Sequence, residues 1–156
     1  MKFKESQSYK CLKTICLWSL LGDLIIIACF FIGYIMTCIA GFVISSDFAQ
    51  GFGWLAIVAP VILLKLFFLL CFAIANGYFA FILYLEYKKN TQSLPLLIVN
   101  KTEQFFDKLI KNNLVKNIIF ILSILSFIVN IIISAINFYT ILIGFITFGI
   151  LLLIKK

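Results

Sequence analysis

The chain has 156 residues, of which 64% are hydrophobic and 12% are charged, and this composition excludes a water-soluble globule, in which about half of the residues are apolar. Its net charge of +7 comes from 13 lysines and six acidic residues, because the chain contains no arginine. In a membrane protein such an excess reports orientation and contact with anionic lipid, so no nucleic-acid partner is expected.

The first half of the chain contains two long apolar tracts, which predict two membrane-spanning helices. We expect a cytoplasmic or interfacial N-terminus over residues 1–20 and a first span over 21–44, because about 20 apolar residues cross the hydrocarbon core. Residues 45–61 are predicted as an outer loop with an interfacial segment, followed by a second span over 62–85. A long, tilted second helix is the alternative, and it would place Lys65 inside the membrane.

The segment 86–116 is predicted as a cytoplasmic loop that contains an amphipathic helix over about 101–116. Its apolar side chains recur at helical spacing, and Asp107 and Lys111 are spaced to pair across one turn. We expect this helix to lie on an anionic leaflet, with docking on a partner protein as the alternative. The residues assigned to this membrane-surface helix are Phe105, Phe106, Lys108, Leu109, Ile110 and Lys111.

The last apolar tract contains no charge between Ile118 and Ile154. A single helix of this length would measure ~55 Å against a hydrocarbon core of ~30 Å. We therefore predict two short spans, 118–136 and 138–154, with a reversal near Asn137. The expected fold is one membrane domain over residues 1–156, an all-α integral membrane protein whose two helical hairpins form a four-helix transmembrane bundle.

The lysines predict the orientation of this bundle. Twelve of the 13 lysines fall in the N-terminal segment, the 86–116 loop or the C-terminus, which lie on one side of the predicted membrane. The positive-inside rule places both termini in the cytoplasm, with a bacterial inner membrane favoured over an organellar one.

Asp23 and Lys65 are ionisable residues inside apolar tracts, where a charge is costly and usually has a partner or a function. A coupling or structural ion-pair role for Asp23 competes with a tolerated carboxylate at the interface. In a hairpin that turns near Gln50, the two residues would be offset by ~18 Å along the helices. A direct pair is therefore not expected, and Lys65 is predicted to extend outward.

Small and weakly polar residues recur at helical spacing in several predicted spans and permit close helix approach. A self-packing or partner-binding face is the favoured interpretation. A polar pathway lined by Asn76, Ser126, Asn130 and Ser134 is the alternative. The proposed helix-packing residues are Gly33, Thr37, Gly41, Ala73, Gly77, Asn130 and Ser134.

Recognisable catalytic chemistry is sparse in this chain. There is no histidine, which removes the usual proton shuttle and zinc ligand, and the absence of arginine removes bidentate phosphate binding. The five cysteines show no spacing typical of a metal or redox pair. We therefore expect no enzyme, no metal and no cofactor.

Three function classes remain, and an enzyme that acts on lipid is the least favoured of them, because one carboxylate without histidine, arginine or a nucleophile–base pair does not make a site. The favoured one is an accessory or interaction protein: a subunit of a membrane complex, or an immunity- or inhibitor-type protein comparable to four-span bacteriocin immunity proteins in size and topology alone. Its partners would be the bilayer, with anionic lipid on the cytoplasmic side, and either another membrane protein or a second copy of the chain. A small oligomeric transporter, channel or holin-like pore is the alternative.

Overall fold

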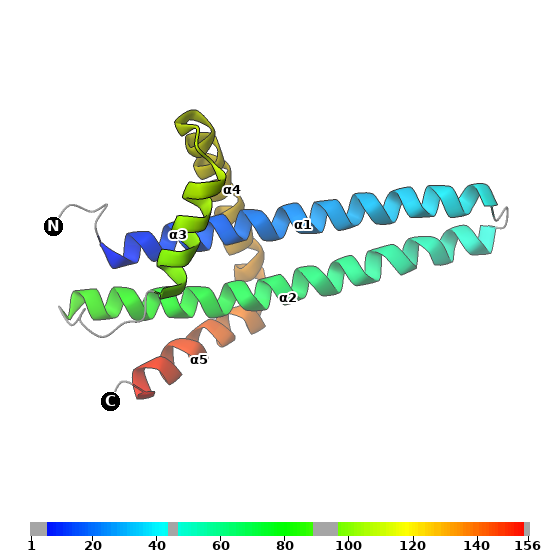
Figure 1. Ribbon diagram of the computed structural model, residues 1–156. Helices are drawn as coiled ribbons and strands as arrows, with labels where there is room; N and C mark the ends of the chain where they lie inside the picture. The colour runs from blue at the N-terminus through cyan, green and yellow to red at the C-terminus, as the bar shows by residue number, and fades with distance from the viewer. Residues whose placement is uncertain (1–5, 44–46, 89–96, 155–156) are drawn as a thin grey trace.

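The computed structural model describes residues 6–43, 47–88 and 97–154, and nearly all of them lie in five α-helices (Figure 1). Side chains are described in these ranges except at 40–52, 54, 97 and 98. The prediction of an all-helical protein is thereby confirmed. The helices are α1 (Gln7–Val43), α2 (Asp47–Tyr87), α3 (Leu97–Leu109), α4 (Asn113–Ile136) and α5 (Phe138–Ile154).

Helices α1 and α2 form a long antiparallel hairpin (Figure 1). The 37 residues of α1 and the 41 residues of α2 correspond to ~55 and ~60 Å at 1.5 Å per residue, well beyond a hydrocarbon core of ~30 Å. Residues 47–61, predicted as an outer loop, are part of α2, and Pro60 lies inside the helix. The structure thus has the long second helix that the sequence offered as the alternative. A proline is tolerated in an apolar helix because neighbouring groups satisfy the freed carbonyl.

The open end of the hairpin is fastened by Glu86, in the last turn of α2. Its Oε1 accepts hydrogen bonds from the backbone N–H groups of Gln7 (2.6 Å) and Ser8 (3.1 Å), and its Oε2 accepts one from the Ser8 hydroxyl. Ser6 Oγ accepts a further bond from the backbone of Tyr9 (3.2 Å). The first N–H groups of a helix have no internal partner and carry partial positive charge. The Glu86 carboxylate therefore caps α1 from the other helix.

Asn137 separates α4 from α5. Its backbone N–H donates to the carbonyl oxygen of Ser134 (3.1 Å), and its side-chain Nδ2 donates to that of Ile133 (3.0 Å). Thr140 Oγ1 also donates to Ser134 O (2.7 Å). These bonds satisfy carbonyl groups that the end of a helix leaves without partners, so the polar residues around position 137 can end one helix inside an apolar sequence and begin the next.

Helix α3 begins and ends earlier than predicted. It runs from Leu97 to Leu109, whereas residues 110–112 are not helical. Asn112 is the N-cap of α4, and its Oδ1 accepts a bond from the backbone of Leu114 (3.0 Å). Asparagine favours this capping position over a helix interior because its side chain bonds the nearby backbone. The predicted helix 101–116 is therefore divided between two helices.

The shorter helices cover one part of the hairpin. Helix α4 packs mainly on α1, α5 packs mainly on α2, and α3 crosses α1 (Figure 1). The core lies in the half of the hairpin nearer the N-terminus, where Cys11 and Ile15 of α1 meet Phe72 and Ile82 of α2. Phe127 of α4 closes this core through an edge-to-face contact with Phe72, with ring centroids 5.5 Å apart. We call this part the covered half of the hairpin.

The rest of the hairpin, over residues 24–39 and 55–64, carries mainly exposed apolar side chains, and we call it the bare half. Within the part of the chain that the structure describes, three helical segments are long and apolar enough to cross a membrane: Gln7–Ile39, Leu55–Tyr87 and Asn113–Ile136. Helix α5 is also apolar but has 17 residues. Large exposed apolar surfaces require cover by lipid or protein. The fold therefore defines a membrane-embedded helical protein.

Candidate functional site

Asp23 and Lys65 face each other across the hairpin. Asp23 lies 20 residues before the end of α1 at Val43, and Lys65 lies 18 residues after the start of α2 at Asp47. At 1.5 Å per residue their heights along the hairpin differ by ~3 Å. The prediction that they do not pair is therefore wrong, because it placed the turn near Gln50 and so displaced the two helices relative to each other.

The Asp23 carboxylate accepts hydrogen bonds on both oxygens. Lys65 Nζ donates to Oδ1 at 2.6 Å and forms an ion pair with it. Ser126 Oγ and Asn130 Nδ2, both from α4, donate to Oδ2 at 2.6 and 2.9 Å. Burying a charge in an apolar surrounding requires both a countercharge and hydrogen bonds. The carboxylate has both.

Asn130 of α4 is hydrogen-bonded to both helices of the hairpin. Its Oδ1 accepts a hydrogen bond from Lys65 Nζ of α2 (2.8 Å), and its Nδ2 donates one to Ser19 Oγ of α1 (2.8 Å). The Ser19 and Ser126 hydroxyl oxygens are 3.0 Å apart and share a hydrogen bond. Asn130 is buried, with 5% of its surface exposed. We call Ser19, Asp23, Lys65, Ser126 and Asn130 the polar cluster.

The spacing of these residues explains why they meet. Ser19 and Asp23 are four residues apart on α1, and Ser126 and Asn130 are four residues apart on α4, so each pair lies on one helix face. Lys65 reaches them from α2 with its flexible side chain. Asp23, Lys65 and Asn130 are among the residues singled out from the sequence. Ser126 is expected from the sequence only as a lining residue of the alternative polar pathway. Ser19 is not singled out there, although its four-residue spacing from Asp23 could have indicated it.

The hydrogen bonds of the polar cluster join α1, α2 and α4. One carboxylate and one ammonium give it a net charge near zero, and their side chains are 24% and 26% exposed. Its carboxylate, ammonium, amide and hydroxyl groups are hydrogen-bonded to one another.

Four of the seven proposed packing residues lie at two separate helix contacts. Gly33 of α1 lies against Ile57 of α2, so that an added Cβ would be 2.6 Å from Ile57 Cγ2. Gly77 of α2 lies against α5, where a Cβ would be 2.6 Å from the carbonyl oxygen of Gly144 and 2.9 Å from Thr147 Cβ. Both glycines therefore allow an approach that a larger residue would obstruct.

The other proposed packing residues are distributed as follows. Thr37 lies beside Gly53 at the α1–α2 contact, and Ala73 lies near Gly144 at the α2–α5 contact. Gly41 is in α1 but outside the residues whose side-chain surroundings are described. Ser134 is in the last turn of α4, where its carbonyl accepts the Thr140 hydroxyl. The predicted set therefore does not form one continuous surface.

Some residues assigned to the membrane-surface helix are exposed, and others line a cavity inside the protein. Phe105 and Leu109 of α3 are exposed, as are Lys108 on the same helix and Lys111 in the following connection. Phe106 and Ile110 instead line a cavity of about 250 Å³ between α1, α3 and α4. One apolar side of the predicted helix is therefore covered by the protein itself.

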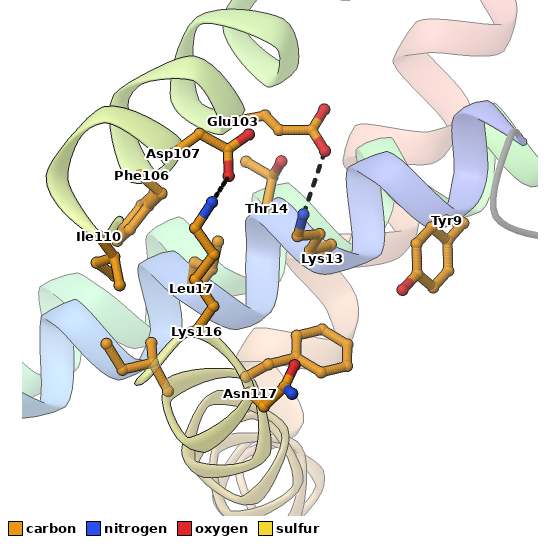
Figure 2. Close-up of a pocket in the computed structure, with 12 residues that line it drawn as sticks. Tyr9, Lys13, Thr14, Leu17, Glu103, Phe106, Asp107, Ile110, Lys116 and Asn117 are labelled. Atoms are coloured by element: carbon orange, nitrogen blue, oxygen red, sulfur yellow. Dashed lines mark hydrogen bonds and ion pairs between the residues drawn. The ribbon is translucent and has the colours of Figure 1, made fainter. Parts of the chain in front are cut away.

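Two ion pairs lie on the walls of this cavity (Figure 2). Lys13 of α1 is 3.2 Å from Glu103 of α3, and Lys116 of α4 is 2.8 Å from Asp107 of α3. The predicted partner of Asp107 was Lys111. Lys116, whose ammonium donates a hydrogen bond to Asp107, lowers the pKa of that carboxyl below its usual value of 3.8. Neither pair could be predicted from helical spacing along the sequence, because each joins residues of two different helices.

Metal binding finds no support in the described ranges 6–43, 47–88 and 97–154, where no three His, Cys, Asp or Glu side chains come together as ligands. The five cysteines are free, with Cys11 and Cys16 buried and Cys29, Cys38 and Cys71 exposed toward the surroundings of the helices. Their distribution along α1 and α2 leaves them as small apolar side chains.

No family model, curated protein or solved structure matches the chain. Its function is therefore inferred from its own residues.

Proposed function

We propose that this protein is a non-enzymatic accessory or interaction protein of a membrane, such as a subunit of a membrane complex or an immunity- or inhibitor-type protein. The observation that carries the proposal is the contrast between the two halves of the hairpin. The polar groups of the covered half bond one another in the polar cluster, whereas the bare half has apolar side chains that α3, α4 and α5 do not cover.

The bare half has the length that a membrane contact requires. Its α1 segment, residues 24–39, extends for ~22 Å, which is most of the ~30 Å thickness of a hydrocarbon core. Helix surfaces that face lipid and helix surfaces that face a partner protein are both apolar. A partner helix is bound in preference to lipid when it packs closely against the surface. We propose that the bare half binds the transmembrane helices of another membrane protein.

The orientation belongs to the same proposal. We place four spans in the membrane, with α5 as the shortest, and both termini in the cytoplasm of a bacterium or the equivalent side of an organelle. The start of α1 and the end of α5 lie at the same end of the hairpin (Figure 1), and α3, which carries Lys101 and Lys108, crosses α1 toward that end. Reporter fusions at each terminus test this arrangement, because both must report the cytoplasm.

The partner is tested by extracting the tagged full-length protein from its native membrane in a mild detergent. Mass determination and identification of the co-purified chain are expected to give a complex of defined stoichiometry. The variant Phe31→Ala/Leu63→Ala trims two exposed side chains of the bare half and should reduce capture of that chain. The matched variant Phe145→Ala/Leu153→Ala trims two side chains of α5 that are at least as exposed and should leave capture unchanged.

An oligomeric transporter, channel or holin-like pore is the second candidate. The observation in its favour is that the Asp23 and Lys65 side chains remain about a quarter exposed, which is unusual for charges in apolar helices. A homo-oligomer without a foreign partner would support it. In that case Asp23→Asn should change transport while leaving the oligomer intact.

A further inference from the structure

The cavity between α1, α3 and α4 has walls that carry four charges of two signs (Figure 2). Glu103 and Asp107 lie one turn apart on α3, while Lys13 and Lys116 approach them from α1 and α4. At about 250 Å³ the cavity has room for about eight water-sized groups. It is separate from the polar cluster, which lies farther along α1 and α4.

The charges favour a ligand that is itself a zwitterion. The two cations and two carboxylates sum to zero, so an anionic ligand would meet two carboxylates and a cationic ligand would meet two ammonium groups. Like charges in a partly desolvated site are repulsive. A ligand with one phosphate and one ammonium can instead accept hydrogen bonds from the lysines and donate them to the carboxylates, and such charge-assisted bonds are the strongest available.

The rest of the lining is mainly apolar, with Tyr9, Thr14 and Asn117 as its uncharged polar residues. Phe106 of α3 and Phe120 of α4 line the cavity. Beyond it, α1 and α4 carry exposed apolar side chains such as Leu24 and Leu125. Trp18 of α1 is exposed beside this region, and its Nε1 donates to Thr102 Oγ1 at 3.4 Å. Tryptophan and lysine typically lie at headgroup level.

We infer that this cavity binds the headgroup of a phospholipid with a primary amine, phosphoethanolamine. Its phosphate lies between Lys13 and Lys116, its ammonium bonds Glu103 and Asp107, and its acyl chains extend along the apolar surfaces of α1 and α4. A choline headgroup lacks N–H donors for the carboxylates, and a glycerol headgroup lacks the cation. The inference goes beyond the proposed accessory role, because it requires membrane embedding alone.

The test is native mass spectrometry of the full-length protein released from detergent. It is incubated with an equimolar mixture of phosphatidylethanolamine, phosphatidylcholine and phosphatidylglycerol that have identical acyl chains. We expect about tenfold more ethanolamine lipid than either competitor, as one or two additional charge-assisted hydrogen bonds allow. Equal binding of the three lipids would overturn the inference. Soluble phosphoethanolamine should bind more weakly than the lipid, and equal binding would overturn the assignment to a lipid.

Two double variants test the residues. Glu103→Gln/Asp107→Asn leaves two uncompensated lysines, so the preference should change from the ethanolamine lipid to phosphatidylglycerol. Lys108→Gln/Lys111→Gln removes two exposed charges outside the cavity and should bind as the wild type does. A loss of folding alone cannot produce a change of preference. If the carboxylate variant retains the wild-type preference, the inference is wrong. The single variant Glu103→Gln, which should show a smaller change, replaces the double variant if the latter does not fold.

Discussion

The polar cluster can be tested by removing its two charges separately and together. Asp23→Asn keeps the shape of the side chain but removes its charge and one of its two acceptor oxygens. Lys65→Met keeps most of the length of the side chain but removes the donor to both Asp23 and Asn130. The double variant removes both charges and leaves a neutral set of amide and hydroxyl groups on α1 and α4.

The magnitude follows from the contacts. Asp23 accepts three hydrogen bonds, and a bond to a charged group is worth ~1.5–3 kcal/mol when buried. Because both side chains are about a quarter exposed, we expect less than the full sum, about 2–3 kcal/mol for each single variant. The double variant should cost about the same as either single one, which gives a coupling free energy of about 2–3 kcal/mol.

The assay is equilibrium unfolding of the full-length protein in mixed micelles with increasing dodecyl sulfate, followed by far-ultraviolet circular dichroism. The matched control is the same cycle on Asp107 and Lys116, whose side chains are 56% and 35% exposed at a separation of 2.8 Å. An exposed pair should couple by ~0–1 kcal/mol. If the Asp23–Lys65 coupling is no larger than the control, the cluster does not hold the helices as we argue.

Three further predictions concern other contacts. Gly77→Ala should destabilise the protein by about 1–3 kcal/mol through overpacking in the same unfolding assay, because the added Cβ would be 2.6 Å from Gly144 O. The control Gly149→Ala should not destabilise it, because its added Cβ would meet no atom of another part of the protein within 4 Å. Glu86→Ala should cost about 1–2 kcal/mol and accelerate amide hydrogen exchange at residues 7–10, since their cap is lost; unchanged exchange would contradict the cap. The Asp107–Lys116 pair lowers the pKa of Asp107 below 3.8, so its contribution is complete above that value and is lost as the pH falls through the folded pKa. The stability difference between wild type and Asp107→Asn should therefore be constant above about pH 5 and shrink below about pH 4; a difference that persists at lower pH would refute this.

Features encoded locally could be predicted from the sequence. The all-helical class follows from long apolar tracts in which every amide must bond within its own helix. The helix break at Asn137 follows from a short polar segment whose side chains bond the adjacent carbonyls. Asp23, Lys65 and Asn130 could also be singled out one by one, because a polar side chain in such a tract needs a partner.

Relations between helices required the tertiary structure. The Asp23–Lys65 pair depends on where the hairpin turns, and a shift of a few residues in the start of α2 moves Lys65 by several ångströms along Asp23. The Asp107–Lys116 pair depends on the end of α3 at Leu109 and the start of α4 at Asn113. Because residues 110–112 are not helical, the four-residue spacing that predicted Lys111 as the partner of Asp107 does not apply. Glu86 caps a helix that begins 79 residues earlier.

The sequence by itself determined that this chain is helical, that it is embedded in a membrane and which of its residues are anomalous there. These properties depend on hydrophobicity and on hydrogen bonds between residues a few positions apart. Only the tertiary structure decided that the anomalous residues satisfy one another in a single cluster, and that α4 and α5 leave half of the hairpin bare. The reason is that helix register and crossing position are set by side-chain packing between segments far apart in the chain, such as Gly77 on Gly144 and Phe72 on Phe127.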